Sequence, residues 1–314
     1  MVKPAKCAFL FPGQGAQYPG MGKDFFEAFP IVRETFEEAE DILGRGISDI
    51  IFQGPEEILT KTSNSQTGIF IVSVAILRLV NDQFPELRPS SVAGLSLGEY
   101  TALTAASSIS FRECLYLVEK RGKYMHEACE ETKGTMAVIL GLTADQVLEL
   151  VEDAGMPDEL FAANFNCPGQ VVISGTYRGI EVGSLLAKER GAKRVLALQV
   201  HGAFHSGLMK SAEERLKPRI LSAHIRRGFA DLFMNVTGNK EENLDQIRNC
   251  LIRQVTHPVL WEKIIRNMEN EGIDFYVEMG PGTTLSGFNK RIDVNAPTLS
   301  IQSIKDLEKL SAYL

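Results

Sequence analysis

One serine between two glycines is the most promising nucleophile in the sequence. Residues 94–98 read GLSLG, a G-x-S-x-G spacing that places Ser96 where a strand turns into a helix. Small residues at Gly94 and Gly98 allow a tight turn that pushes the serine side chain outward. The backbone amide of Leu97 would then face the same point and help to bind an oxyanion. A purely structural turn remains the alternative, because this spacing also arises by chance.

A serine hydroxyl is a weak nucleophile and needs a base within hydrogen-bonding distance. Of the five histidines, His126 lies near a helix end, His224 lies close to two arginines, and His257 precedes a proline. The other two, His201 and His205, follow a predicted strand, as a base on a strand-end loop would. We favour His205, with His201 as a core or supporting residue. No aspartate between residues 96 and 205 suits a triad, so a Ser-His pair oriented by another group is expected.

Arg121 lies on the apolar face of a predicted helix over residues 111–128. A buried guanidinium requires a carboxylate, carbonyl groups or a ligand as partner. One interpretation is a structural ion pair. The other is a clamp for a substrate carboxylate, because the planar guanidinium pairs with carboxylates through two hydrogen bonds.

The elements around Ser96 predict a mostly parallel sheet covered by helices on both faces. Residues 6–11 and 91–94 are predicted strands, and residues 99–106 are a predicted helix. Functional residues in such sheets gather at the carboxyl ends of the strands. The glycine-rich loop at residues 12–22 fails the dinucleotide pattern G-x-G-x-x-G, because position 18 is Tyr.

The middle of the chain follows a different pattern. Predicted strands at 135–142, 160–166, 170–175 and 193–200 enclose predicted helices at 144–155 and 177–191. This βαββαβ order is typical of a ferredoxin-like unit. We therefore predict an inserted small subdomain, residues 131–201, in a large subdomain formed by residues 1–130 and 202–314. Later strands are predicted at 232–238 and 275–280, and helices at 246–255, 259–272 and the C-terminus.

Composition excludes several classes of protein. The chain has 314 residues, 44% hydrophobic and 23% charged, with a net charge of −7 and a pI near 5.4. An acidic chain does not suit nucleic acid or an anionic membrane as partner. Five scattered cysteines favour neither disulfides nor a metal site, and indicate a reducing, cytoplasmic location. The apolar segment 68–80 is short for a membrane span and predicts a buried helix.

Seven motifs, in order and over almost the whole chain, resemble the malonyl-CoA:acyl carrier protein transacylases. This is the acyltransferase family of fatty acid synthesis and polyketide synthases. The motifs are FPGQGAQYPGMG (11–22), GLSLGEY (94–100), RGKYM (121–125), NFNCPGQVVISG (164–175), GAFHS (202–206), RQVTHP (253–258) and EMGPGTTLSGF (278–288). The family fold is an α/β-hydrolase-like large subdomain with a ferredoxin-like small one. The chain differs at Leu95, where the family usually has His.

The resemblance implies a role for each matching residue. Ser96 would carry the acyl group, and His205 would be the base, oriented by the main-chain carbonyl of Gln254. Arg121 would bind the malonyl carboxylate. The other implied residues are the backbone amides of Gln14 and Leu97 as the oxyanion hole, Met125 in the substrate pocket, and Phe204, whose bulk would disfavour an α-methyl branch.

The implied activity is transfer of a malonyl group from malonyl-CoA to the phosphopantetheine thiol of acyl carrier protein, through a malonyl-serine ester. No metal or cofactor is expected beyond the two substrates, malonyl-CoA and holo-acyl carrier protein, and the enzyme is expected to be a monomer. Three alternatives remain: a trans-acting polyketide acyltransferase, an acyl hydrolase, and a non-catalytic module that binds carrier protein.

Overall fold

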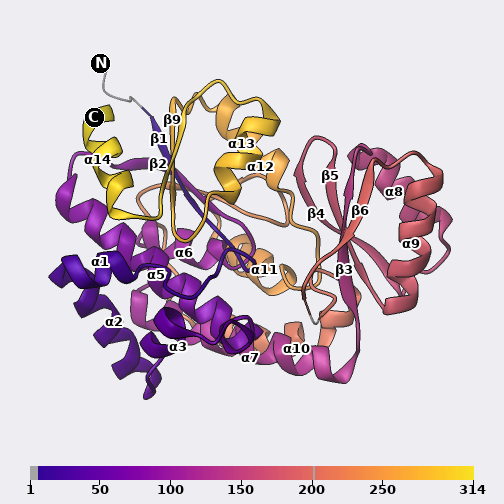
Figure 1. Cartoon of the computed structure of the whole chain (residues 1–314), viewed down its shortest axis with the longest axis horizontal. Helices are drawn as coiled ribbons and strands as arrows, with labels where there is room; N and C mark the ends of the chain where they lie inside the picture. The colour runs from indigo at the N-terminus through magenta and orange to yellow at the C-terminus, as the bar shows by residue number, and fades with distance from the viewer. Residues whose placement is uncertain (1–5, 201) are drawn as a thin grey trace.

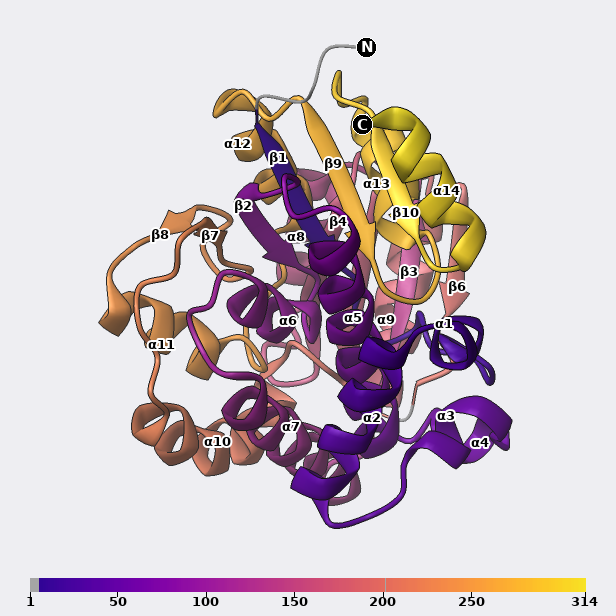
Figure 2. The same ribbon diagram turned by 90° about the vertical axis from the view of Figure 1, so that its left-hand side faces the viewer.

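A six-stranded, mostly parallel sheet forms the larger part of the molecule (Figure 1). The computed structural model describes residues 6–200 and 202–314, so His201 lies outside the described residues. The strand order is β10-β9-β1-β2-β7-β8, and only the last pair is antiparallel. Figure 2 shows β10, β9, β1 and β2 side by side. The strands are β1 (Cys7–Phe11), β2 (Pro89–Gly94), β7 (Asp231–Phe233), β8 (Lys240–Glu241), β9 (Phe275–Met279) and β10 (Thr298–Ile301).

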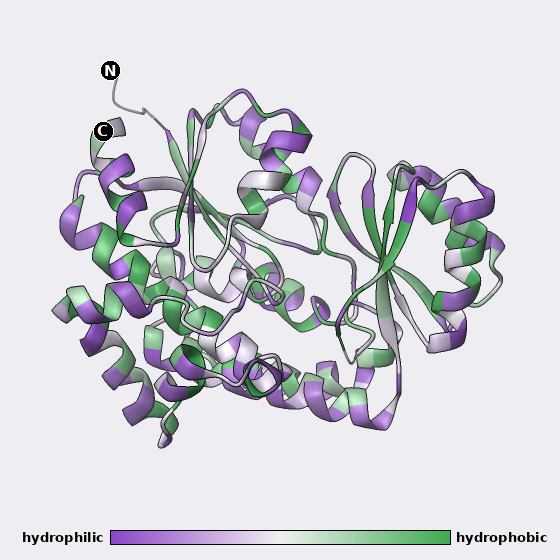
Figure 3. Cartoon of the chain, in the orientation of Figure 1, coloured by the Kyte–Doolittle hydropathy of each residue, from purple (hydrophilic) through white to green (hydrophobic). Residues whose placement is uncertain are grey.

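Strand β1 lies at the centre and is buried on both faces, which explains its continuous apolar sequence. Alternate side chains point to opposite faces of a strand. Phe9 and Phe11 therefore join the core on one face, whereas Ala8 and Leu10 pack with Trp261 on the other. Figure 3 shows hydrophobic residues on the central strands, and alternating hydrophilic and hydrophobic residues along the outer helices.

Helices cover both faces of this sheet, as predicted. One face carries α12 (Trp261–Asn270) and α13 (Thr284–Ile292). The helices of the other face include four that the sequence did not predict, the short helices α1, α3 and α4 and the longer α2. They are α1 (Lys23–Ala28), α2 (Pro30–Leu43), α3 (Ser48–Gln53), α4 (Glu56–Leu59), α5 (Thr62–Gln83), α6 (Gly98–Ala105), α7 (Phe111–Glu131), α10 (Lys210–Ser222), α11 (Leu244–Arg253) and α14 (Ile304–Tyr313).

Helix α5 is the central helix of the larger core. It spans 22 residues, so the predicted segment 68–80 was too short. Within the described residues, α5 alone has the length and apolar composition to cross a membrane, but 83% of its most apolar window is buried in the protein. The prediction of a buried core helix is confirmed, although the reason given from length was wrong.

The second sheet has four antiparallel strands in the order β4-β5-β3-β6. Its βαββαβ element order is the predicted one, and the α/β fold class is confirmed. The subdomain boundaries at 131 and 201 remain a prediction. The elements are β3 (Thr135–Leu140), α8 (Ala144–Asp153), β4 (Leu160–Cys167), β5 (Gln170–Gly175), α9 (Tyr177–Glu189) and β6 (Arg194–Ala197), the last shorter than predicted.

The two faces of the small sheet have different neighbours. Ala137 and Ile139 point toward α8 and α9, which lie on its outer side (Figure 1). Met136 and Val172 point the other way, into a cavity shared with the large sheet. Strand β4 connects the two parts, because Phe165 N–H donates to the Val259 carbonyl at 2.9 Å. The cavity therefore lies between the two sheets.

Candidate active site

The turn after β2 holds Ser96 in a strained conformation. Its φ of 52° is unusual for a residue with a side chain, and such strain is typical of functional turns. Both flanking glycines are required by close contacts. A Cβ on Gly94 would lie 1.9 Å from the backbone of Gly98, and a Cβ on Gly98 would lie 2.1 Å from the Phe11 carbonyl oxygen. The turn is therefore fixed by backbone packing, and it exposes the serine hydroxyl at the carboxyl end of β2.

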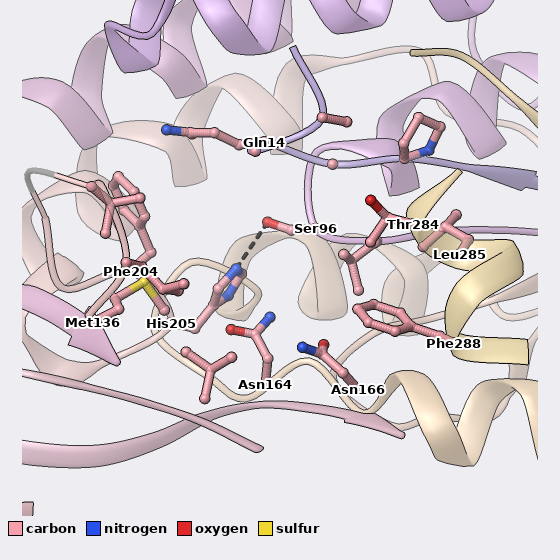
Figure 4. A pocket seen from close by; sticks show the side chains of 18 of the residues that line it. Gln14, Ser96, Met136, Asn164, Asn166, Phe204, His205, Thr284, Leu285 and Phe288 are labelled. Carbon is pink, nitrogen blue, oxygen red and sulfur yellow. Dashed lines mark hydrogen bonds between the residues drawn. The ribbon is translucent and has the colours of Figure 1, made fainter. Parts of the chain in front are cut away.

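The hydroxyl of Ser96 faces the imidazole of His205, as Figure 4 shows. The distance from Ser96 Oγ to His205 Nε2 is 2.8 Å. On the other side of the ring, His205 Nδ1 lies 2.8 Å from the main-chain carbonyl of Gln254. A carbonyl only accepts hydrogen bonds, so Nδ1 carries the proton and Nε2 is free to accept one from the serine. The structure thus brings together the three groups that the sequence singled out.

The environment keeps His205 neutral. Burial, and then the positive charge of Arg121, lower the pKa of His205 from 6.5 to about 4. A neutral imidazole is the form that can accept a proton from Ser96. Among the described residues no carboxylate is hydrogen-bonded to His205. This agrees with the expectation of a pair oriented by a group other than an acid.

Arg121 is buried, as predicted, and its side chain is only 1% exposed. Its Nη2 donates to Ser96 Oγ at 3.0 Å and to Gln254 Oε1 at 2.8 Å. Nη1 donates to Gln66 Oε1 at 2.6 Å. The Nε–H group has no acceptor among the described residues. A cation whose partners are mainly neutral amide oxygens, beside the nucleophile, is suited to receive an anionic group of a bound substrate.

Two backbone amides near Ser96 have no acceptor within the described part of the chain, those of Gln14 and Leu97. Gln14 belongs to the loop after β1, and Leu97 precedes α6. Both loops follow the carboxyl ends of neighbouring parallel strands, which explains why they meet here. These amides are free to stabilise an oxyanion, the role that the resemblance implied for them.

The cavity in front of Ser96 has a volume of about 220 Å³. Met125 and Phe204, both predicted substrate residues, contribute to its wall. Leu95 also lines it and packs against the core beneath α12 and α13. Figure 4 shows Phe204 and Met136 at one end and Phe288 and Leu285 at the other. Its polar wall residues include Asn164 and Asn166 of β4.

Sequence reasoning missed two buried polar residues that hold the turn. Asn235 Oδ1 accepts from Ser96 N–H at 2.7 Å, and its Nδ2 donates to the Gly94 carbonyl at 2.7 Å. The sequence predicted a strand over 232–238, but β7 ends at Phe233, which leaves Asn235 in the following loop. Its position just after a strand beside β2 was the signal that could have revealed it. The second is Glu99, the first residue of the predicted helix over 99–106, whose carboxylate accepts a hydrogen bond from the backbone N–H of Asn235.

Glu99 is a buried carboxylate behind the nucleophile. Glu99 is 0% exposed, and burial raises its pKa, whereas the hydrogen bonds from Asn235 and Gln254 and the charge of Arg121 stabilise its ionised form. Gln254 links Glu99 to Arg121, because its amide nitrogen donates to the carboxylate and its amide oxygen accepts from the guanidinium.

A serine–histidine pair, two free amides and a buried cation together suit acyl transfer through a covalent serine ester. The family described as "Acyl transferase domain" matches residues 8–288, and the chain belongs to it. Its relatives include the malonyl CoA-acyl carrier protein transacylase of Bacillus subtilis (strain 168), 41% identical over 309 residues, 97% of this chain and 96% of the relative. The protein of that name from Escherichia coli (strain K12) is 39% identical over 307 residues, 98% of both chains.

Solved structures give the same result. A malonyl-transacylase in complex with a type II PKS acyl-carrier protein superimposes with a TM-score of 0.95 and 36% identity, covering 99% of this chain and all of that one. An acyl carrier protein S-malonyltransferase from Vibrio cholerae gives a TM-score of 0.93 and 36% identity, covering 98% of this chain. The family and the acyltransferase class predicted from the sequence are confirmed.

Proposed function

We propose that this protein transfers a malonyl group from malonyl-CoA to the phosphopantetheine thiol of acyl carrier protein. The convergence of His205 Nε2 and Arg121 Nη2 on Ser96 Oγ, at 2.8 and 3.0 Å, is the observation that carries this proposal. It places a base and a cation at one nucleophile, so the acyl group formed there can bear a free carboxylate. The solved complex of a related transacylase with an acyl carrier protein supports the partner.

In the first half-reaction, His205 Nε2 takes the proton of Ser96 as Oγ attacks the malonyl thioester carbon. The oxyanion of the tetrahedral intermediate accepts hydrogen bonds from the amides of Gln14 and Leu97. When the carbon–sulfur bond breaks, the CoA thiolate takes the proton from His205. The malonyl group remains on Ser96 as an ester, and its carboxylate pairs with Arg121.

The second half-reaction repeats these steps in reverse. His205 removes the proton of the carrier protein's phosphopantetheine thiol, and the sulfur attacks the ester carbon. The ester bond breaks, and Ser96 Oγ recovers the proton from His205. Water must be kept from the ester between the two steps, because its attack would release malonate. The apolar wall that includes Phe204, Leu285 and Phe288 is suited to this exclusion.

We place the reaction in extender-unit supply for fatty acid synthesis, by a soluble, cytoplasmic, monomeric enzyme with no cofactor. A trans-acting polyketide acyltransferase would use the same chemistry with another carrier protein. An acyl hydrolase would use the same pair without a second thiol. The cation at Arg121 favours an acyl group with a free acid over a simple alkanoyl ester.

Mass spectrometry of the intact protein tests the proposal. Incubation with malonyl-CoA should add one malonyl group, and the added mass should be lost only when holo-acyl carrier protein is supplied. A Ser96→Ala variant should gain no mass. A gain that decays in buffer would identify a hydrolase, and a gain that persists in the variant would place the nucleophile elsewhere.

A further inference from the structure

Glu99 lies one turn behind the nucleophile and is fully enclosed by protein. Its Oε2 accepts from Gln254 Nε2 at 2.5 Å, and its Oε1 accepts from the backbone N–H of Asn235 at 2.5 Å. A buried carboxylate is costly unless its oxygens are hydrogen-bonded. Both oxygens face N–H donors, and these donors belong to the two residues that hold the catalytic turn.

The contact with Gln254 fixes which way that amide points. Gln254 Nε2 also donates to the Ser96 carbonyl at 2.9 Å, so two acceptors lie on its nitrogen side. Its Oε1 must therefore face Arg121 and accept from Nη2. Reversal of the amide would set oxygen against oxygen at Glu99 and nitrogen against nitrogen at Arg121. Glu99 thus determines the orientation of the group that holds the guanidinium beside Ser96.

Gln254 also contacts His205, through its main chain. The carbonyl of Gln254 accepts from His205 Nδ1, while the side chain of Gln254 is held by Glu99. A carboxylate that does not contact the imidazole is in this way connected to it through a single residue.

The second oxygen of Glu99 holds the Ser96 turn. Asn235, whose N–H it accepts, bonds both the N–H of Ser96 and the carbonyl of Gly94 through its side chain. The carboxylate therefore contacts Gln254, which positions His205 and Arg121. It also contacts Asn235, which positions Ser96. Glutamine has the same shape but only one acceptor oxygen, so it cannot accept hydrogen bonds from both Gln254 and Asn235.

We propose that Glu99 is a positioning residue that keeps Ser96, His205 and Arg121 in the relative positions that acyl transfer requires. It touches none of the reacting atoms and acts through Gln254 and Asn235. This inference rests on the proposed function, because its measure is the formation of the malonyl ester on Ser96.

The test compares Glu99→Gln with wild type for acylation of Ser96 by malonyl-CoA and by acetyl-CoA. We expect malonyl acylation to slow by about 10- to 100-fold, the rate equivalent of one lost hydrogen bond to a charged group. The preference for malonyl over acetyl should fall as well, because Gln254 no longer fixes Arg121. If Glu99 were only structural, the melting temperature would fall while the rate and the preference of the folded protein stayed at wild-type values; that result overturns the proposal.

A double-mutant cycle gives a second, independent measurement. In a Gln254→Ala background, Glu99→Gln should slow acylation much less than it does in wild type, because the side chain through which Glu99 acts is gone. Full additivity would contradict the proposal. Should Glu99→Gln fail to fold, Glu99→Asp keeps the charge but is too short to reach both donors. It is expected to show a smaller loss, and a wild-type rate would refute the role.

Glu278 offers a matched control, since it is another 0% exposed carboxylate that accepts from backbone N–H groups, those of Leu285 and Ser286. Glu278→Gln should lower the melting temperature without reducing the malonyl-over-acetyl preference. If wild type forms no malonyl ester, the proposed function itself fails. If wild type forms the ester and Glu99→Gln equals it in rate and preference, only the role of Glu99 fails.

Discussion

Replacing Arg121 with Ala removes the cation beside the nucleophile. Arg121 Nη2 lies 3.0 Å from Ser96 Oγ, so the free carboxylate of a malonyl group on Ser96 lies within its reach. Each charge-assisted hydrogen bond contributes about 1.5–3 kcal/mol. The loss of two such bonds should lower kcat/KM for malonyl-CoA by about 10²- to 10⁴-fold. Acetyl-CoA has no carboxylate, so its rate should fall far less and the malonyl preference should collapse.

The same change also affects stability. The amide oxygens of Gln66 and Gln254 lose their donor, at about 1–3 kcal/mol each when buried and unsatisfied. The ratio of malonyl to acetyl transfer is therefore the quantity to measure, because a partly unfolded sample lowers both rates alike. Arg112→Ala is the control, since Arg112 is an exposed residue on the same helix. A variant at position 121 that kept its malonyl preference would refute the clamp.

The low pKa of His205 and the packing around Gly98 give two further predictions. Since only neutral His205 accepts a proton, and its pKa is lowered to about 4, acylation by the free enzyme should be lost on acidification near pH 4 rather than 6.5. Short pH-jump assays would show this. In Arg121→Ala the loss should move to higher pH, because one cause of the low pKa is removed; an unchanged midpoint would contradict this assignment. Gly98→Ala should lower the free energy of unfolding by about 3 kcal/mol in denaturant titrations, because its Cβ would lie 2.1 Å from the Phe11 carbonyl oxygen. Gly287→Ala, with nothing within 4 Å of its Cβ, should instead raise stability by about 0.5–1 kcal/mol, and equal losses at both sites would refute the packing argument.

Local patterns predicted much of the framework. The strand at 6–11 and the βαββαβ order of the middle segment carry strong alternation or clear turn residues, and both were predicted within a few residues. The short helices between residues 23 and 59 were missed, because pieces of four to six residues carry little periodicity; even the longer α2 went unrecognised. Strand β7 was predicted too long, because the apolar run continues past Phe233 after its pairing with β2 has ended.

The sequence by itself determined the chemistry that is available. G-x-S-x-G, a histidine in a strand-end loop and an arginine on an apolar face define a nucleophile, a base and a cation, since residue type and local spacing decide these properties. Only the tertiary structure decided how they meet. Ser96 and His205 are 109 residues apart, and the groups that hold them, Glu99, Asn235 and Gln254, come from three separate segments. Hydrogen bonds across such distances leave no period in the sequence, because they depend on how the sheet brings its loops together.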